Sequence, residues 1–252
     1  MRHALVTAGS KGLGRKVTDM LLEKGYSVTI SYRNDKKAVE KLKADWAGAE
    51  ERLQCINADI TKPADIKQLV QKAKEQFGRI DLLINNAGPY IFEPKKLMDY
   101  EPEEWHEMIE GNLSSMFYLL KETVPIMREQ HYGRVIAYGF QGAGQAPAWP
   151  YRSAYAAAKS GLSSLVKTTA VEEAENGITI NMVCPGVITS EYKEAGIEDA
   201  RPVKDNSIPV GRPSTGGDIA RTILFLCEED SDMITGTVME VTGGVDVLHK
   251  RR

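Results

Sequence analysis

A glycine-rich turn near the start of the chain is the feature that most restricts how this sequence can fold. It joins a short apolar stretch, residues 5–8, to residues 12–22, whose apolar positions have helical spacing. Glycines at a strand–helix junction let backbone N–H groups approach a phosphate at the positive end of the helix. A second apolar stretch over residues 26–31 completes a βαβ unit of the length found in dinucleotide-binding proteins. We therefore predict a dinucleotide site at Gly9, Ser10, Lys11, Gly12, Leu13 and Gly14.

Strand-like and helix-like stretches alternate along the chain. Further strands are expected over residues 53–58, 80–84, 133–138, 177–183 and 238–241. Helices are expected over residues 35–47, 66–77, 102–130, 153–176 and 219–227. Such alternation predicts an α/β fold with a doubly wound parallel sheet. We expect the long helix to be bent or interrupted near Pro125, because proline removes a helix hydrogen bond.

The composition excludes several classes of function. With a net charge of −3, the 252-residue chain lacks the basic field that binding to nucleic acid or to an anionic membrane requires. We interpret the basic residues 249–252 as a solvated terminus. The three cysteines are far apart and the four histidines lack ligand spacing, so we expect neither a disulfide nor a metal site. No apolar stretch is long enough to cross a bilayer, and we expect a cytoplasmic protein.

The residues after the second strand indicate which dinucleotide binds. An acidic side chain there would bond the ribose 2′-hydroxyl of NAD. This chain instead has Arg33, with Lys11 in the glycine turn. Two cations favour the 2′-phosphate of NADP over NAD, although Asp35 lies close to Arg33 in the sequence and weakens this inference. Asp59 and Ile60, which follow the third strand, are expected to border the adenine ring.

Tyr155 and Lys159 are the strongest candidates for chemistry. They stand four positions apart in an alanine-rich stretch, so a helix would place both side chains on one face. A cation beside a phenol favours the phenolate and lowers its pKa from about 10. That shift makes the hydroxyl a proton donor or acceptor near neutral pH. The pair therefore predicts acid–base catalysis, and the alternative is an amphipathic surface helix.

Four motifs together resemble the short-chain dehydrogenase/reductase family over essentially the whole chain. They are residues 7–14, Asn85-Asn-Ala-Gly88, Tyr155 with Lys159, and Pro185-Gly186. The resemblance implies a single Rossmann-type domain over residues 1–252 with about seven strands, a nicotinamide cofactor and a homotetramer. It also implies cofactor contacts at Asn86, Ala87, Gly88, Tyr155, Lys159, Pro185, Gly186, Val187, Ile188 and Thr189.

The resemblance also implies which residues act on the substrate, namely Asn112 and residues at the end of the fifth strand. The resemblance gives Asn112 the role of holding a water in a proton relay. Where the family has a serine that binds the substrate oxygen, this chain has Phe140. We predict Gln141 as the substitute, because its amide can donate a hydrogen bond to a carbonyl oxygen. Tyr138 and Tyr151 are the other candidates, the latter if the helix of Tyr155 starts one turn early.

The glycine turn also departs from the family. The family usually has glycine where Ala8 stands, followed by a small residue, whereas here the order is reversed. Because Ala8 and Gly9 are both small, we expect the approach of the phosphate to survive.

The whole-chain pattern looks most like that of 3-oxoacyl-[acyl-carrier-protein] reductases. It implies an NADPH-dependent reductase of a carbonyl, either a 3-oxoacyl thioester or a small ketone or aldehyde, with Tyr155 as the general acid. Residues 190–213 form a predicted substrate lid. The alternative is a dinucleotide-binding sensor or scaffold with weak or no catalysis, because Phe140 replaces the serine.

Overall fold

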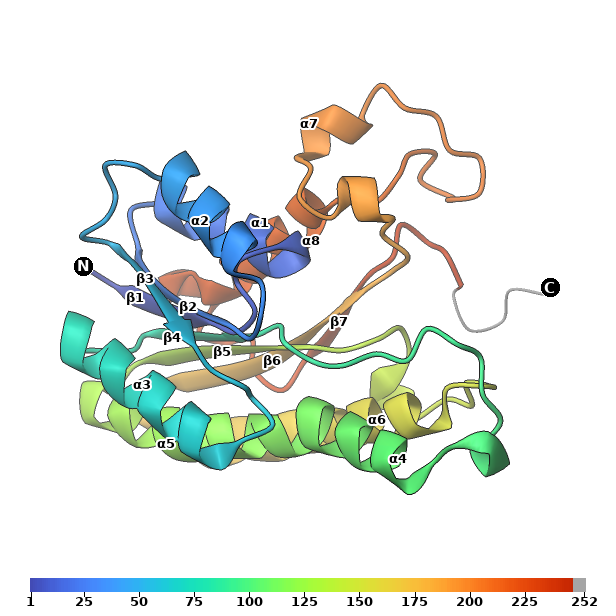
Figure 1. Ribbon diagram of the computed structural model, residues 1–252, viewed down its shortest axis with the longest axis horizontal. Helices are drawn as coiled ribbons and strands as arrows, with labels where there is room; N and C mark the ends of the chain where they lie inside the picture. The colour runs from blue at the N-terminus through green and yellow to red at the C-terminus, as the bar shows by residue number, and fades with distance from the viewer. Residues whose placement is uncertain (247–252) are drawn as a thin grey trace.

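Seven parallel strands form one continuous sheet through the centre of the protein (Figure 1). The computed structural model describes residues 1–246, so the basic residues 249–252 lie outside the described part. Across the sheet the strands follow the order β3-β2-β1-β4-β5-β6-β7. Their bounds are β1 His3–Val6, β2 Ser27–Tyr32, β3 Leu53–Asn57, β4 Leu82–Asn85, β5 Gly133–Tyr138, β6 Ile178–Pro185 and β7 Val238–Val241.

Helices cover both faces of this sheet, which confirms the expected doubly wound α/β arrangement (Figure 1). One face, called here the α1/α8 face, carries α1 (Gly12–Glu23), α2 (Lys36–Asp45) and α8 (Gly216–Cys227). The opposite face, called the α5/α6 face, carries α3 (Pro63–Phe77), α4 (Pro102–Ile109), α5 (Ser115–Gln130) and α6 (Ser153–Glu173).

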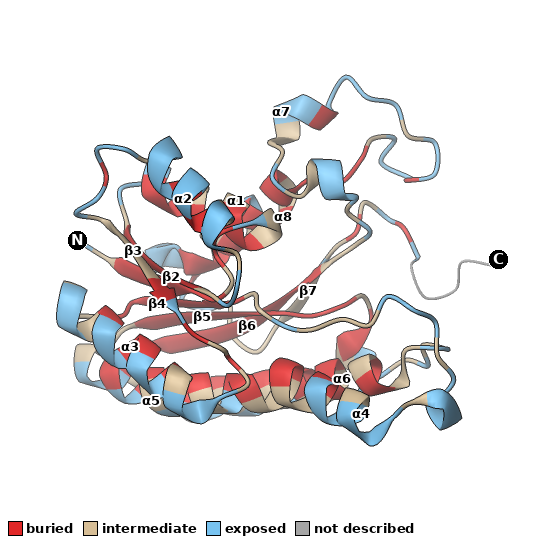
Figure 2. Cartoon of the chain, viewed as in Figure 1, coloured by how far each residue is buried: buried red, intermediate tan, exposed pale blue. Residues whose placement is uncertain are grey.

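Alternate side chains of the strands fill two separate apolar layers. In β5, Ile136 and Tyr138 belong to the layer beneath the α1/α8 face, and Val135 and Ala137 to the layer beneath the α5/α6 face. This period of two follows from the pleat of a strand. The central strands β4 and β5 are buried along their whole length, as Figure 2 shows in red. Burial on both sides explains why their sequences are mostly apolar.

The chain changes its direction of travel across the sheet between β3 and β4. From β1 it steps outward to β2 and β3, and then returns to β4 on the opposite side of β1. The connections that leave β1 and β4 therefore diverge. A crevice opens at such a point, at the carboxyl ends of the strands, where open α/β sheets bind their ligands. The glycine turn follows β1 and Asn85-Asn86 ends β4, so both lie at this crevice.

The helix expected over residues 102–130 is in fact two helices joined by a π-helical segment. α4 ends at Ile109, Glu110–Ser114 is π-helical, and α5 continues to Gln130. Pro125 lies inside α5 without ending it, so the interruption is at residues 110–114 rather than near the proline. A π-helical turn holds an extra residue and occurs frequently at functional sites. Asn112 lies at its centre.

Residues 190–213 connect β6 to α8 through short pieces that include the one-turn helix α7 (Ile197–Ala200). In Figure 1 this segment, drawn in orange, projects beyond the body of the sheet. Most of its side chains are exposed. Its position after β6 fits the predicted lid, and the lid function stays a prediction. Within residues 1–246, no helix combines the length and the apolar character needed to cross a membrane.

Ala8 has a backbone conformation that normally calls for glycine. Its φ is +51°, in the left-handed region that costs a residue with a Cβ about 1–2 kcal/mol. The next residue, Gly9, cannot carry a side chain, because a Cβ there would lie 2.5 Å from Cγ2 of Ile30. The turn therefore forms with alanine at a conformational cost.

Ala8→Gly should raise the free energy of unfolding by about 1 kcal/mol, because glycine adopts a positive φ without the steric cost. The measurement is urea denaturation of the cofactor-free protein followed by circular dichroism. Ala44→Gly, at an exposed position inside α2, is the control and should lower the same quantity by about 1 kcal/mol. A destabilised Ala8→Gly protein would contradict the strain assigned to the turn.

Candidate active site

Asn86 fastens the glycine turn to the end of β4. Its side-chain amide donates to the carbonyl oxygens of Thr7 at 3.1 Å and Ala8 at 3.2 Å. The Thr7 hydroxyl adds a second link, since it donates to Oδ1 of Asn85 at 3.1 Å and accepts from the N–H of Ala87 at 2.9 Å. These bonds hold the two sides of the crevice at a fixed spacing. Thr7 belongs to the glycine motif but was not predicted as a site residue.

The glycine turn already binds an anionic group. The N–H of Gly12 donates to Oε1 of Glu194 at 2.7 Å, so a carboxylate from residues 190–213 lies at the start of α1. A phosphate would use the same donor, because the positive end of a helix favours negative charge. Gly14 keeps this end compact, since a Cβ there would lie 2.4 Å from the Ala8 carbonyl oxygen. The sequence did not single out Glu194, which is remote from the turn along the chain.

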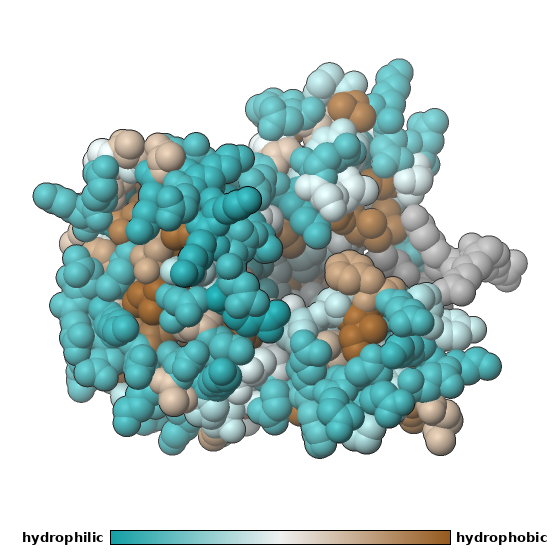
Figure 3. Space-filling model, viewed as in Figure 1, coloured by the Kyte–Doolittle hydropathy of each residue, from teal (hydrophilic) through white to brown (hydrophobic). Residues whose placement is uncertain are grey.

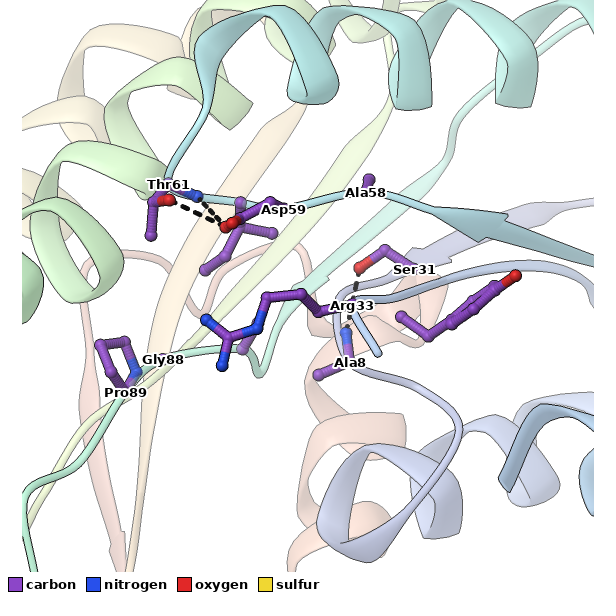
Figure 4. A pocket seen from close by; sticks show the side chains of 11 residues that line it. Ala8, Ser31, Arg33, Ala58, Asp59, Thr61, Gly88 and Pro89 are labelled. Carbon is purple, nitrogen blue, oxygen red and sulfur yellow. Dashed lines mark hydrogen bonds between the residues drawn. The ribbon is translucent and has the colours of Figure 1, made fainter. Parts of the chain in front are cut away.

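A small pocket at the ends of β1, β2 and β3 surrounds Arg33 (Figure 4). The guanidinium lies between Asp59 and the turn at Gly88-Pro89. Asp59 accepts hydrogen bonds from the N–H and the hydroxyl of Thr61 at 3.0 and 2.8 Å. Burial alone would raise the pKa of Asp59, but these bonds and the charge of Arg33 lower it below its ordinary value. The lining of this Arg33 pocket consists of residues 8, 31–33, 58–61 and 87–89.

Lys11 lies away from the Arg33 pocket. Its ammonium pairs with Oδ2 of Asp35 at 3.0 Å, and both side chains are exposed. Asp35 also caps α2, because its Oδ1 accepts from the N–H of Ala38 at 3.1 Å. Lys11 borders the larger cleft described next. Of the two cations expected to select NADP, Arg33 is therefore the one that lines the pocket at the end of the second strand.

A larger cleft of about 620 Å³ shares Ala8, Ala87 and Gly88 with the Arg33 pocket. Figure 3 shows a hollow on this face of the molecule, bordered by both hydrophilic and hydrophobic side chains. Among the predicted site residues, those that line the cleft are Lys11, Gly12, Leu13, Asn86, Ala87, Gly88, Asn112, Gln141, Tyr155, Lys159, Pro185, Gly186, Val187 and Ile188. The lining also includes residues that sequence reasoning had not assigned to the site, namely Tyr90, Phe92 and Lys193.

The remaining predicted cofactor residues lie around these two cavities. Arg33, Asp59 and Ile60 line the Arg33 pocket. Ser10 is buried within the glycine turn. Thr189 borders a neighbouring cavity, and its hydroxyl donates to Oε1 of Glu191 at 3.5 Å.

Tyr155 and Lys159 both line the cleft from the first turns of α6, which begins at Ser153. Lys159 is 4% exposed, and its ammonium donates to the carbonyl oxygen of Tyr138 at 2.8 Å. Burial lowers the pKa of Lys159 to about 8. Burial also raises the pKa of Tyr155 above its ordinary value, which is opposite to the shift expected from a neighbouring cation. The ammonium lies 5.7 Å from the centre of the Tyr155 ring.

Asn112 presents a buried acceptor in the same cleft. Its Nδ2 donates to the carbonyl oxygens of Pro89 at 2.9 Å and Met108 at 3.1 Å. Its Oδ1 is buried without a hydrogen-bond partner within residues 1–246. Gly88 leaves room for this oxygen, because a Cβ there would lie 2.3 Å from it. An unpaired buried acceptor is costly, so this position suits a polar group that enters the cleft.

Aromatic rings enclose Tyr155 on the side where the family resemblance expected a serine. Phe140 stacks on Trp149 with ring centroids 4.9 Å apart, and Tyr90 meets Tyr155 edge-on, also at 4.9 Å. Arg152 orients Tyr90 by donating from Nε to its hydroxyl at 2.7 Å. The serine is therefore replaced by part of an apolar wall built from two connections, the one after β4 and the one between β5 and α6.

The three candidates to replace the serine differ in their positions. Gln141 lines the cleft next to Phe140, and its role as a donor stays a prediction. Tyr151 has a φ of +65° and precedes α6, so the early helix start that would place it one turn before Tyr155 does not occur. The Tyr138 ring belongs to the layer of the α1/α8 face, whereas Tyr155 packs against the opposite layer.

Comparisons with known proteins agree with this geometry. Residues 7–246 match the family model described as "Enoyl-(Acyl carrier protein) reductase". The Bacillus subtilis protein named "Putative oxidoreductase YtkK" is 59% identical over 253 residues, covering 100% of this chain and 99% of that protein. The chain belongs to the short-chain dehydrogenase/reductase family.

Two further relatives support the assignment to this short-chain dehydrogenase/reductase family. A solved structure described as "Structure of putative 3-oxoacyl-reductase from bacillus thuringiensis" has 60% sequence identity and a TM-score of 0.94, covering 99% of this chain and 100% of that one. The Escherichia coli 3-oxoacyl-[acyl-carrier-protein] reductase FabG is 36% identical over 249 residues, which is 96% of each chain. The protein is thus an oxidoreductase whose family uses a nicotinamide dinucleotide.

Three observations indicate that the cleft of this short-chain dehydrogenase/reductase suits a nicotinamide dinucleotide. The N–H of Gly12 binds a carboxylate where a phosphate group would bind. The Arg33 pocket offers a cation at the end of β2. Finally, Oδ1 of Asn112 is an unpaired acceptor in the part of the protein that the structure describes. The chain therefore presents an anion-binding N–H, a cation and a buried acceptor along this crevice.

Removal of the Glu194 carboxylate should strengthen dinucleotide binding. Glu194→Ala frees the N–H of Gly12, so we expect the Kd for NADP⁺ to fall about two- to fivefold. Isothermal titration calorimetry measures this change. Glu198→Ala is the control, because Glu198 lies in the same segment and pairs with Arg201 at 3.1 Å rather than with the turn. An equal fall in both variants would attribute the effect to net charge alone.

Proposed function

We propose that this short-chain dehydrogenase/reductase reduces a carbonyl group with NADPH. The observation that carries the proposal is that Tyr155 and Lys159 share one cleft with the glycine turn. Hydride transfer to a carbonyl needs a proton donor beside the dinucleotide, and one cavity here is lined by both Tyr155 and the glycine turn.

Three polar residues of the cleft, Tyr155, Lys159 and Asn112, have a part in the proposed reaction. When bound, NADPH supplies a hydride to the carbonyl carbon. Tyr155 donates a proton to the carbonyl oxygen, and its raised pKa keeps the phenol protonated until that oxygen becomes basic. Lys159 has a pKa of about 8, so it is mostly charged at neutral pH and holds the nicotinamide ribose. Oδ1 of Asn112 anchors the water that returns a proton to Tyr155.

Arg33 supports NADPH rather than NADH as the cofactor. Its guanidinium lines the pocket at the end of β2, and a guanidinium binds phosphate with two parallel hydrogen bonds. Lys11 contributes less than its position in the sequence indicates, because Asp35 neutralises it. The preference for the 2′-phosphate therefore depends chiefly on one residue.

The proposed substrates are 3-oxoacyl thioesters and small ketones or aldehydes. The name of the Escherichia coli relative FabG favours the former. The rings of Phe140, Trp149 and Tyr90 around Tyr155 favour a substrate that is apolar next to its carbonyl. Gln141 is proposed to donate the hydrogen bond that the absent serine would make. Residues 190–213 are proposed to close over the bound substrate.

A dinucleotide-binding sensor or scaffold is the second candidate function. The observation in its favour is Phe140, because the loss of one donor to the developing oxyanion typically costs a factor of about 10²–10³ in rate. The presence of Tyr155, Lys159 and Asn112 in one cleft favours the enzyme.

The proposed enzyme is a cytoplasmic homotetramer. Support for an assembly comes from apolar side chains on the outer surface of α5 and α6, where Phe117 is 48% and Val171 is 78% exposed. Light scattering coupled to gel filtration measures the number of subunits.

Tyr155→Phe should abolish turnover and leave cofactor binding intact, because it removes the proton donor and keeps the ring. We expect a fall in kcat of about 10²–10⁴ with an unchanged Kd for NADPH. The assay follows NADPH absorbance with acetoacetyl thioesters, small ketones and aldehydes. Tyr118→Phe, in α5 outside the cleft, is the matched control. A near-normal rate for Tyr155→Phe would refute the assignment, and tight NADPH binding by the wild type without turnover of any substrate would favour the sensor.

Arg33→Ala should weaken NADPH binding far more than NADH binding. The loss of a charged hydrogen-bond donor to the 2′-phosphate corresponds to an increase of about tenfold or more in the Kd for NADPH. The Kd for NADH should stay close to its wild-type value. Cofactor fluorescence measures both constants, and Lys11→Ala is the control with a smaller expected effect, since Asp35 already pairs with that lysine. Equal Kd values for the two cofactors in the wild type would contradict the preference.

A further inference from the structure

The hydroxyl of Tyr138 is a buried polar group without a partner in the described protein. Tyr138 is the last residue of β5 and is 6% exposed. Its hydroxyl makes no hydrogen bond within residues 1–246. An unpaired buried hydroxyl is unfavourable, and phenylalanine would fill the same space without that cost. Packing within the protein therefore does not explain why position 138 has a tyrosine rather than a phenylalanine.

The position of the ring separates Tyr138 from the proton donor. Tyr138 shares its apolar layer with Val6, Ile84 and Val183 on the α1/α8 side of the sheet. Tyr155 packs against the layer on the opposite side. The ammonium of Lys159 bonds the carbonyl oxygen of Tyr138 and fixes the backbone between the two layers. The Tyr138 hydroxyl is thus poorly placed to share a substrate oxygen with Tyr155.

Tyr138 nevertheless lines the large cleft. Leu13, at the start of α1, and Ile188, in the loop after β6, line the same cleft and pack against the same apolar layer. Tyr138 is not part of the lining of the Arg33 pocket. A dinucleotide whose adenosine half occupies the Arg33 pocket would extend its other half past Leu13 and Ile188. That half carries phosphate, ribose and carboxamide oxygens, all of which accept hydrogen bonds.

We propose that the Tyr138 hydroxyl donates a hydrogen bond to the nicotinamide-nucleotide half of the bound dinucleotide. The inference rests on the proposed function, because it requires such a cofactor in the cleft. It assigns Tyr138 to cofactor binding and leaves proton transfer to Tyr155. Burial raises the pKa of Tyr138 above its ordinary value, so the phenol keeps its proton and acts as a donor.

Tyr138→Phe tests the inference, because it removes the hydroxyl and keeps the ring. We expect the Kd for NADP⁺ to rise about five- to tenfold, as for the loss of one buried hydrogen bond. The Kd for 2′,5′-ADP, which has the adenosine half alone, should be unchanged. The melting temperature of the cofactor-free protein should be unchanged or higher, since an unpaired hydroxyl is removed. Isothermal titration calorimetry and thermal denaturation give these values.

Thr179→Val is the matched control. The Thr179 hydroxyl is likewise buried without a partner in the described residues, but it lies near the start of β6, at the amino end of the sheet. This variant should leave the Kd of both ligands unchanged. Tyr138→Leu gives an independent measurement if the phenylalanine variant does not fold, with the same expected loss of affinity for NADP⁺ alone.

Three results would overturn the inference while leaving the proposed function in place. They are an unchanged Kd for NADP⁺ in Tyr138→Phe, an equal loss of affinity for 2′,5′-ADP, and a lower melting temperature of the cofactor-free variant. The last result would mean that the hydroxyl bonds the protein itself. A wild-type protein that binds neither NADP⁺ nor NAD⁺ would overturn the inference and the proposed function together.

Discussion

The two hydrogen bonds that Asn86 donates to the end of β1 hold the geometry on which the rest of the site depends. β1 and β4 are neighbours in the sheet, yet the chain diverges where it leaves them. By bonding the carbonyl oxygens of Thr7 and Ala8, the Asn86 amide keeps the crevice at one width. That spacing leaves the N–H of Gly12 to bind an anion on one side and Gly88 to border Asn112 on the other. A short asparagine side chain thus holds together elements from both halves of the sheet.

Local periodicity was sufficient to predict the order of strands and helices, because each element buries one regularly spaced set of side chains. It was not sufficient for the π-helical segment, where the Asn112 amide bonds the carbonyl oxygen of Pro89, which is distant in sequence. The same limit applies to charge. The sequence did not show that Asp35 would engage Lys11, or that burial would raise the pKa of Tyr155. The motifs were sufficient to predict which residues line one cleft, whereas the charges and pKa values of those residues depended on packing.

The family's serine is missing from the cleft, and several aromatic side chains, rather than one substituted residue, occupy its surroundings. Phe140 is visible in the sequence, but Tyr90 comes from the connection after β4, and the fold brings it to Tyr155 together with Trp149. Because Phe140 is buried against Trp149, a serine placed there alone would leave a cavity next to the indole. The surrounding aromatic side chains are therefore part of the same apolar wall beside Tyr155.

The π-helical segment Glu110–Ser114 acts as a one-residue insertion in an otherwise continuous α4–α5 helix. An α-helix advances about 100° per residue. A deletion of one residue here would restore regular helix hydrogen bonds and would also rotate α4 against α5 by that angle. The buried face of α5 would then stay in register with the core only if Asn112 turned away from the cleft. The number of residues in this short stretch therefore determines whether Asn112 faces the cleft while α5 keeps its packing.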